Sequence, residues 1–317
     1  MMVSIMSKQQ KNTYPQSLYH RPVMLSECLE GLNIKPDGIY VDLTFGGGGH
    51  SRAILEKLNQ DGILIGFDQD KDSIKNIIDD KRFIFINDNF STLKDNLRLY
   101  RFFKVDGILA DLGVSSHQID EASRGFSTRF DSQLDMRMNQ NGELNAKDII
   151  NNYSERELRN IFNLYGELPN AYQIAKRIVE NRENPINTTL ELKELLMPLA
   201  PKMIENKFFA MVFQALRIEV NNEIEVLKEM LSQTSEVLKE KGRLVVMSYH
   251  SLEDRLVKNY MKTGNIEGKL EKDFYGNNLT CFQLITRKPI TATDEEESEN
   301  PRARSAKLRI AEKVIGK

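Results

Sequence analysis

The chain has 317 residues, a formal net charge of −2, two cysteines and 40% hydrophobic residues. This length favours two domains and a core that needs no disulfide or metal. The small net charge excludes bulk charge as evidence for nucleic-acid binding, and the absence of an apolar run of about 18 residues excludes a membrane-spanning helix. The N-terminus is polar, so the sequence predicts a cytoplasmic protein in which Cys28 and Cys281 are buried thiols.

The first hundred residues alternate between strand-like and helix-like segments. We predict strands over 39–44, 62–67, 83–86 and 105–110, and helices over 50–58, 71–78 and 92–99. Short apolar runs bounded by Gly, Asp or Asn are typical of buried parallel strands. Their alternation with helices predicts right-handed βαβ units in an α/β fold with a doubly wound, mostly parallel sheet.

The alternation stops after Gly113. Four helices are predicted over 146–153, 155–164, 171–181 and 190–196, with no strand from 122 to 207. Ser154 and Glu157 form a capping box before the second helix, and Thr189 is predicted to cap the fourth. We therefore expect an all-helical domain, residues 121–208, inserted into a domain made of residues 1–120 and 209–317. The latter continues with an amphipathic stretch (210–240), a strand (243–248), a helix (253–261) and two late strands (279–286 and 307–311).

Four consecutive glycines, Gly46–Gly49, lie where the first strand turns into the first helix. Glycine lets the backbone approach a ligand closely and adopt positive φ. Asp68 ends the second strand, 19 residues beyond Gly49, close to the usual offset of an acid that binds ribose hydroxyls. This order of features predicts an adenosine-containing cofactor. The alternative is a purely structural turn, which would be costly because glycine destabilises regular structure by up to ~1 kcal/mol per residue.

The motifs around the glycine loop narrow the choice of cofactor. A dinucleotide fingerprint would need Gly or Ala where this chain has Ser51 or Arg52, which argues against a nicotinamide-dependent oxidoreductase. A P-loop motif is absent. S-adenosylmethionine has no phosphate and needs a glycine loop and a ribose-binding acid, so it is the predicted cofactor.

Two further loops follow predicted strands, at 111–118 and 248–255. Ligands of open parallel sheets bind outside the carboxyl ends of strands, so both loops should face the cofactor. We predict that Asp111 and His250 lie near the reacting group. The alternatives are a solvated loop for the first and a helix cap at Ser251 for the second. The histidines are not spaced as metal ligands, so no metal site is predicted.

The C-terminal region carries an acidic run, 294–299, followed by a basic tail. The basic residues are Arg302, Arg304, Lys307, Arg309, Lys313 and Lys317. Such a tail can neutralise phosphates, or the two blocks can simply keep a surface segment solvated.

Seven segments of this chain together resemble a known family. They are His20–Leu25, Asp42–Ser51, Asp111–Ser116, Leu134–Met138, Phe213–Ile218, Ser248–Arg255 and Asn300–Ser305. In this order they resemble the bacterial small-subunit rRNA cytosine-N4 methyltransferases, also called MraW or RsmH, from about Tyr19 to Ala311.

The resemblance implies a class I S-adenosylmethionine methyltransferase fold with a helical insert. It implies methylation of N4 of a cytidine in the decoding region of 16S rRNA, cytidine 1402 in the customary rRNA numbering, in the small ribosomal subunit. The implied cofactor contacts are Gly48, Gly49, His50, Asp68, Phe90, Asp111 and Gln118. An rRNA-binding assembly factor without catalysis and an amine methyltransferase acting on DNA are the alternatives. The residues leave a monomer and a homodimer both open.

Catalytic roles do not transfer cleanly from related enzymes. Amine methyltransferases of this class usually carry Asp- or Asn-Pro-Pro-aromatic after the fourth strand, whereas this chain has Asp111-Leu-Gly-Val114. Asp111 and His250 are therefore predicted near the reacting group on chemical grounds, and Tyr249 is predicted to stack on the target base. The helical insert and the basic tail are the candidates for gripping rRNA.

Overall fold

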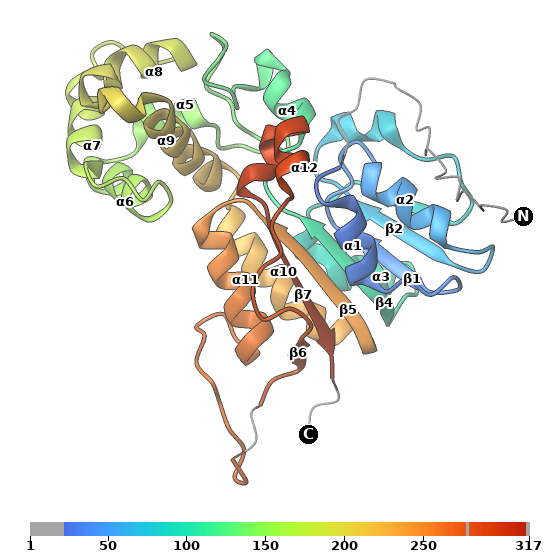
Figure 1. Ribbon diagram of the computed structural model, residues 1–317. Helices are drawn as coiled ribbons and strands as arrows, with labels where there is room; N and C mark the ends of the chain where they lie inside the picture. The colour runs from blue at the N-terminus through green and yellow to red at the C-terminus, as the bar shows by residue number, and fades with distance from the viewer. Residues whose placement is uncertain (1–21, 277–278, 315–317) are drawn as a thin grey trace, which may run out of the picture.

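The computed structural model describes residues 22–276 and 279–314. Its centre is a seven-stranded sheet with the order β3-β2-β1-β4-β5-β7-β6 (Figure 1). The strands are β1 (Ile39–Asp42), β2 (Ile63–Phe67), β3 (Phe83–Ile86), β4 (Val105–Asp111), β5 (Leu238–Ser248), β6 (Phe282–Leu284) and β7 (Lys307–Lys313). Strands β1 to β5 run parallel, while β7 is antiparallel to both β5 and β6. The predicted α/β fold with a mostly parallel sheet is confirmed.

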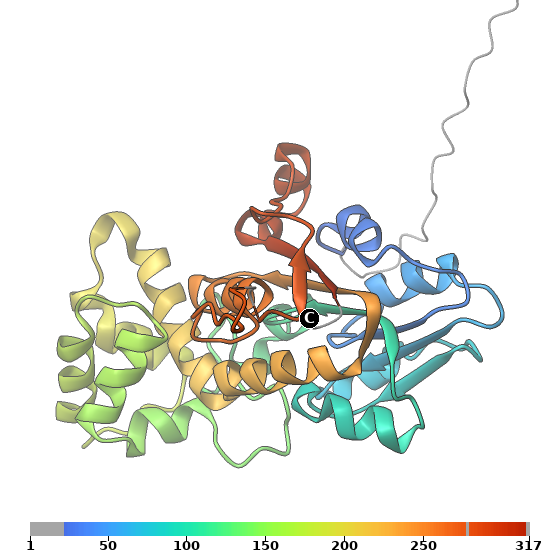
Figure 2. The same cartoon turned by 90° about the horizontal axis from the view of Figure 1, so that it is seen from below.

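Helices cover both faces of the sheet because successive strand residues point to opposite sides. Val41 and Ile65 pack into the hydrophobic cluster of one face, and their neighbours Tyr40 and Leu64 into that of the other. The first face is covered by α3 (Leu93–Leu99), α10 (Glu223–Val237) and α11 (Ser251–Thr263), the second by α1 (Leu25–Leu32) and α2 (Gly49–Lys57). Figure 2 shows the two layers on opposite sides of the sheet.

A third hydrophobic cluster lies between β4 and β5 in the chain and is built mainly from helices, with Leu134, Met136, Leu168 and Ile186 contributed by the connecting segments. Its helices are α5 (Ala146–Asn152), α6 (Glu155–Leu164), α7 (Ala171–Glu180), α8 (Thr189–Leu196) and α9 (Glu205–Val220). The capping box of Ser154 and Glu157 is confirmed. The predicted cap at Thr189 is wrong, because Thr188 accepts the helix N–H while the Thr189 hydroxyl donates to the Phe130 carbonyl. The cluster extends to Leu216 and so includes most of α9.

Two other predicted helices differ from the structure. The segment 71–78 forms a shorter 3₁₀ helix, η1 (Lys71–Asn76). The amphipathic stretch 210–240 is broken into α9 and α10 by Asn222, which has a φ of 49°. The remaining helices are α4 (Ser116–Asp120), α12 (Asp294–Glu299) and the 3₁₀ helices η2 (Phe90–Thr92), η3 (Ala122–Arg124), η4 (Met197–Leu199), η5 (Lys202–Ile204) and η6 (Pro301–Ser305). Within 22–276 and 279–314, no helix combines the length and apolar character needed to cross a membrane.

The basic tail is largely built into the fold. Arg309 lies in β7 with 8% exposure and donates to both carboxylate oxygens of Asp254, at 2.7 and 3.1 Å. Arg302 donates to Asp120 at 3.0 and 3.1 Å. The guanidinium groups of these two residues thus already have carboxylate partners, and phosphate binding by the tail stays a prediction. Lys317 lies outside the described residues.

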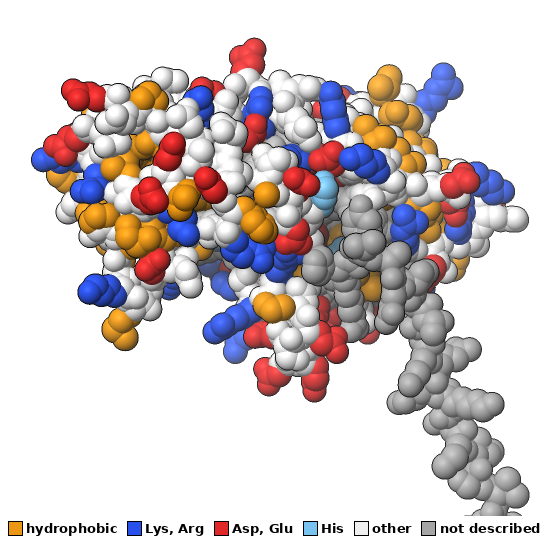
Figure 3. All heavy atoms as spheres, turned by 90° about the horizontal axis from the view of Figure 1, so that it is seen from above, with side chains coloured by type: hydrophobic (Ala, Val, Ile, Leu, Met, Phe, Trp, Pro, Cys, Tyr) orange, Lys and Arg blue, Asp and Glu red, His pale blue; other side chains and the backbone are white. Residues whose placement is uncertain are grey.

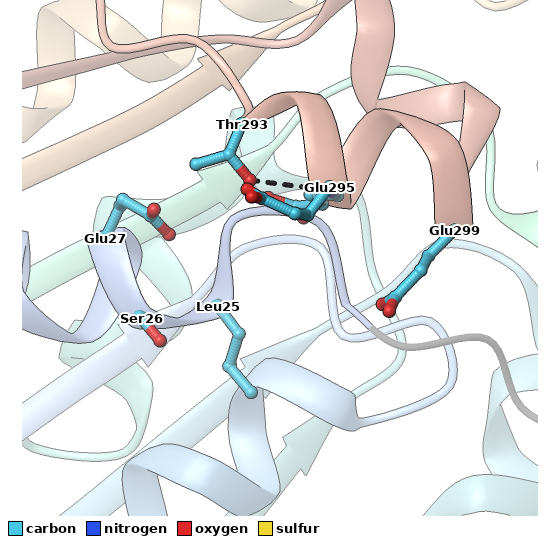
Figure 4. Close-up of a pocket in the computed structure, with 7 residues that line it drawn as sticks. Leu25, Ser26, Glu27, Thr293, Glu295 and Glu299 are labelled. Atoms are coloured by element: carbon cyan, nitrogen blue, oxygen red, sulfur yellow. Dashed lines mark hydrogen bonds between the residues drawn. The ribbon is translucent and has the colours of Figure 1, made fainter.

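The acidic run forms α12, where acidic side chains gather on a protruding end of the molecule (Figure 3). Glu296 accepts a hydrogen bond from the Met24 N–H at 2.6 Å and so ties α12 to the start of α1. A pocket separates the two helices, with Glu27, Glu295 and Glu299 on its walls (Figure 4). The acidic run is thus attached to the start of α1 by a hydrogen bond and does more than keep a surface segment solvated.

Candidate active site

The glycine loop has little room for any other residue. Gly46 and Gly48 have φ of 50° and 75°, in the left-handed region that disfavours side chains. A Cβ atom on Gly49 would lie 2.3 Å from the Cγ of Pro22. The loop is anchored to the end of β2, because the Gly46 N–H donates to Asp68 Oδ2 at 2.7 Å. The glycines are therefore demanded by the local backbone and by the segment that covers them.

His50 joins that covering segment to the end of β4. Its Nε2 lies 3.1 Å from the Val23 carbonyl oxygen, and its Nδ1 lies 4.0 Å from Asp111 Oδ2. Only 7% of the residue is exposed. The imidazole thus binds the segment that covers the glycine loop, and its other nitrogen faces the carboxylate of Asp111 at the end of β4.

Asp68 stands at the carboxyl end of β2, where the sequence predicts a ribose-binding acid. Its two oxygens accept the N–H groups of Gly46 (2.7 Å) and Asp70 (2.8 Å). Burial raises the pKa of Asp68 to about 7, against the lowering effect of these hydrogen bonds. Further donors, such as two ribose hydroxyls, would favour its ionised form.

Gln118 has its side chain engaged inside the protein. Its Oε1 accepts the Ser115 N–H at 3.0 Å, completing the capping box of α4, and its Nε2 donates to Asp70 Oδ2 at 2.7 Å. Arg124 donates to the same carboxylate oxygen at 2.8 Å and also to the Met138 carbonyl. Gln118 is therefore linked through Asp70, whose N–H donates to Asp68, to the acid that ends β2. Arg124 was not predicted from the sequence, because an isolated arginine carries no local signal of burial.

A pocket crosses the carboxyl ends of the strands. Its walls are Thr44, Gln69, Phe90, Leu112, Gly113, Met138, Asn221, Glu223, Val226, Leu227 and Glu253. Phe90, which the resemblance implies as a cofactor contact, thus shares one pocket with the end of β4. Gly113 has a φ of 92°, and a Cβ atom there would find only Tyr249 within 4 Å, at 3.6 Å. The backbone is therefore bare at the point where a ligand would pass β4.

Asp111 ends β4 and is bound by Tyr249. The tyrosine hydroxyl donates to Asp111 Oδ1 at 2.7 Å, while Oδ2 accepts no hydrogen bond from the described residues. Burial raises the pKa of Asp111 to about 6, although His50 and the Tyr249 hydroxyl lower it. Tyr249 packs against the cluster formed with α1. Its hydroxyl contact gives it a positioning role on Asp111, which the sequence analysis did not assign.

His250 belongs to a buried group of charged side chains. Its Nε2 lies 3.1 Å from Glu253 Oε1, yet neither ring nitrogen makes a hydrogen bond in the described structure. Glu253 Oε2 accepts the Tyr249 N–H at 3.0 Å. Arg217, from α9, donates to both oxygens of Glu223 at 2.7 and 2.9 Å. Asp111 and His250 thus lie at the carboxyl ends of the neighbouring strands β4 and β5, with side-chain exposures of 24% and 8%. Their place near the reacting group stays a prediction.

Arg217, Glu223 and Glu253 are functional candidates that were not predicted from the sequence. Arg217 and Glu253 lie inside the motifs that carry the family resemblance, but their pairing depends on how α9, α10 and α11 meet. Ligand atoms of Glu223, His250 and Glu253 lie within 4.8 Å of one another, a spacing that a metal ion could use. The guanidinium bound to Glu223 supplies positive charge there already, which disfavours a cation.

The fold and site together define a class I S-adenosylmethionine-dependent methyltransferase. Its marks are a parallel sheet extended by an antiparallel β7, a glycine loop after β1 and an acid at the end of β2. The chain belongs to the MraW methylase family, whose model matches residues 17–314. The family resemblance seen in the sequence is confirmed.

Curated relatives cover nearly the whole chain. It is 57% identical over 297 residues to the ribosomal RNA small subunit methyltransferase H of Christiangramia forsetii, covering 93% of this chain and 98% of that protein. The protein of the same name from Bacteroides thetaiotaomicron is 56% identical over 296 residues, covering 93% and 97%. A solved putative methyltransferase from Streptococcus mutans, in complex with SAH, is 13% identical with a TM-score of 0.43, covering 92% and 97%.

Proposed function

We propose that this protein transfers a methyl group from S-adenosylmethionine to N4 of a cytidine in the decoding region of 16S rRNA. The observation that carries the proposal is Asp111, a carboxylate at the end of β4 with one oxygen bound to Tyr249 and the other without a hydrogen bond from the described residues. The names of the curated relatives support small-subunit rRNA as the substrate. A ribosomal substrate means that the reaction takes place in the cytoplasm.

The cytosine N4 amine needs a proton acceptor because its lone pair is delocalised into the ring. When bound, S-adenosylmethionine supplies an electrophilic methyl group. Asp111 Oδ2 accepts one N4 hydrogen as a hydrogen bond and takes the proton when the nitrogen gains its methyl group. A carboxyl with a pKa of about 6 is ionised at neutral pH and still more basic than an ordinary aspartate. Proton transfer of this kind contributes about 10²- to 10⁴-fold to the rate.

The cofactor is proposed to lie along the glycine loop and the pocket. Its proposed contacts are Gly48, Gly49, His50, Asp68, Phe90, Asp111 and Gln118. Asp68 would receive the ribose hydroxyls, and the ring of Phe90 would pack on adenine. Gln118 acts here through Asp70, to which its amide is bonded. Gly113 has no side chain, and the space beside it supports a close approach of the cofactor and the target base at the end of β4.

His250 is proposed to act near the reacting group without touching the substrate. Both of its ring nitrogens are buried without a hydrogen bond in the described residues, and its Nε2 lies 3.1 Å from Glu253 Oε1. We therefore assign His250 to holding Glu253, and Asp111 to the proton.

The helical segment 121–208 is proposed to be an inserted domain that recognises rRNA, with 1–120 and 209–317 forming the cofactor domain. A hydrophobic cluster separate from those of the sheet supports a distinct helical unit, and this cluster continues through α9 to Leu216. The target base must be unstacked to reach the pocket, so a surface beside the pocket has to hold the surrounding RNA. Arg304 and Lys307 are the tail residues nearest to this role, because they keep more exposure than Arg302 and Arg309.

The test is methyl transfer from radiolabelled S-adenosylmethionine to small ribosomal subunits from cells that lack this gene, followed by nucleoside analysis. We expect the label in N4-methylated cytidine of 16S rRNA. Label in another nucleoside would overturn the assignment of the base. Label in duplex DNA but not in subunits would favour a DNA amine methyltransferase. Tight rRNA binding without any transfer would favour an assembly factor.

A further inference from the structure

We propose that Glu253 is the specificity residue that reads the exocyclic amine of the target base. This inference rests on the proposed function and names the group that recognises its substrate. It is carried by three features: the direction of the pocket across the sheet, a buried carboxylate oxygen at one end that faces only His250 among the described residues, and the hydrogen-bonding pattern of cytosine.

The pocket has two chemically different ends. Gln69 and Phe90 follow β2 and β3 on one side of the sheet, whereas Glu253 follows β5 on the other. Thr44 and Gly113, after β1 and β4, lie between these two ends. A cofactor that uses the glycine loop after β1 and packs on Phe90 occupies the first end. A base that meets it at β4 has to enter from the second end, beside Glu253.

The two oxygens of Glu253 differ in their partners. Oε2 accepts the Tyr249 N–H, but Oε1 receives no hydrogen bond from the described residues, although His250 Nε2 is 3.1 Å away. The side chain is only 4% exposed. Burial raises the pKa of Glu253, but His250 and Arg217 outweigh it and keep the carboxyl below its usual value, hence ionised. His250 thus supplies charge to this oxygen without a well-formed hydrogen bond, so the oxygen can still accept an N–H from a bound ligand.

Glu223 does not compete for this role. Both of its oxygens are held by the Arg217 guanidinium, which comes from α9. Glu223 thereby lines the pocket in a fixed position, and the positive charge of Arg217 favours the ionised carboxylate of Glu253. The same positive charge favours a neutral N–H donor over a metal ion as the ligand of this end.

An exocyclic amine offers two hydrogens, and the site offers two acceptors. Asp111 accepts the hydrogen that leaves, and Glu253 accepts the one that stays. Cytosine presents a donor at position 4, whereas uracil presents an acceptor oxygen there. A carboxylate attracts the first and repels the second. Glu253 thus selects an amino-bearing pyrimidine before any chemistry occurs.

The test is Glu253→Gln. Glutamine keeps an oxygen for the Tyr249 N–H, so this hydrogen bond before α11 survives. Its NH₂ group adds a donor that can face a carbonyl oxygen. We measure kcat/KM on reconstituted small subunits and the inhibition of that reaction by subunits that carry uridine at the target position. Calorimetry gives the affinity for S-adenosylmethionine. Glu225→Gln, an exposed acid on α10, is the matched control.

For Glu253→Gln we expect kcat/KM to fall about 10- to 100-fold, the size of one base-reading contact. The uridine subunits should inhibit the variant about tenfold more strongly than the wild type, while cofactor affinity stays within about twofold. The wild type alone provides a second test, because it should bind cytidine subunits at least about tenfold more tightly than uridine subunits. Unchanged discrimination in either test would overturn the inference, as would an equal loss of cofactor affinity. If the wild type makes no N4-methylcytidine at all, the proposed function itself is wrong.

Discussion

The hydroxyl of Tyr249 should set the pH at which the enzyme becomes active. This hydroxyl donates to Asp111 at 2.7 Å and favours the ionised carboxylate. Tyr249→Phe removes the donor and keeps the ring that packs beside Gly113. Asp111 must be ionised to take a proton, so activity rises with pH through its pKa. Loss of the hydroxyl raises that pKa, and the rising limb of the pH profile therefore moves to higher pH.

The size of the effect follows from the cost of the lost bond. A hydrogen bond to a charged group is worth about 1.5–3 kcal/mol, and about 1.4 kcal/mol corresponds to one pH unit. The limb should move from about 6 to about 7–8. At pH 6 the ionised fraction of Asp111 would fall from about one half to about 1–10%, so turnover should drop about 5- to 50-fold. At pH 9 both proteins should turn over at similar rates.

The assay is kcat at saturating S-adenosylmethionine from pH 5 to 9, on small subunits that lack the modification. Asp111→Asn is the companion variant, because it keeps an acceptor for the tyrosine hydroxyl and removes the base. It should lose about 10²- to 10⁴-fold at every pH and show no limb near 6. Tyr275→Phe, on an exposed loop, is the control for a lost hydroxyl. A Tyr249→Phe profile that is lower by one constant factor at all pH values would refute the reasoning, since this indicates general damage.

Three further results are expected. Burial raises the pKa of Asp68 to about 7, and ribose hydroxyls favour its ionised form. The Kd for S-adenosylmethionine should therefore fall about tenfold between pH 6 and 8. A Kd that calorimetry finds independent of pH would count against a ribose contact. Gly49→Ala, whose Cβ would lie 2.3 Å from a proline carbon, should lower the free energy of unfolding by about 1–3 kcal/mol in urea titrations, and no change would mean that the covering segment moves freely. Arg124→Ala leaves the buried carboxylate of Asp70 without its guanidinium and should lower the free energy of unfolding by about 3–5 kcal/mol. Arg129→Ala, at an exposed ion pair, should lower it by less than about 1 kcal/mol. Equal shifts of the urea midpoint in the two variants would contradict this.

Local patterns carried most of the fold. The spacing of apolar residues predicted β3 at 83–86 and α6 at 155–164 with the bounds that the structure has. Such elements are defined by short-range periodicity and capping, which a single segment contains in full. Errors arose where the decisive contact is distant or conformational. Thr189 lost its predicted cap to Thr188 because its hydroxyl is drawn to Phe130, and the break at Asn222 depends on a left-handed backbone.

The sequence by itself determined the order of the cofactor features: four glycines after the first strand and an acid after the second, on a chain with a family's motifs. These lie within one βαβ unit, so chain connectivity alone brings them together. Only the tertiary structure decided the partners of the charged groups. It joined Arg217 to Glu223, His250 to Glu253 and Tyr249 to Asp111, and it placed Arg309 in the sheet. The physical reason is that burial and charge pairing depend on which helices and strands meet, and such contacts between distant segments leave no pattern in the local sequence.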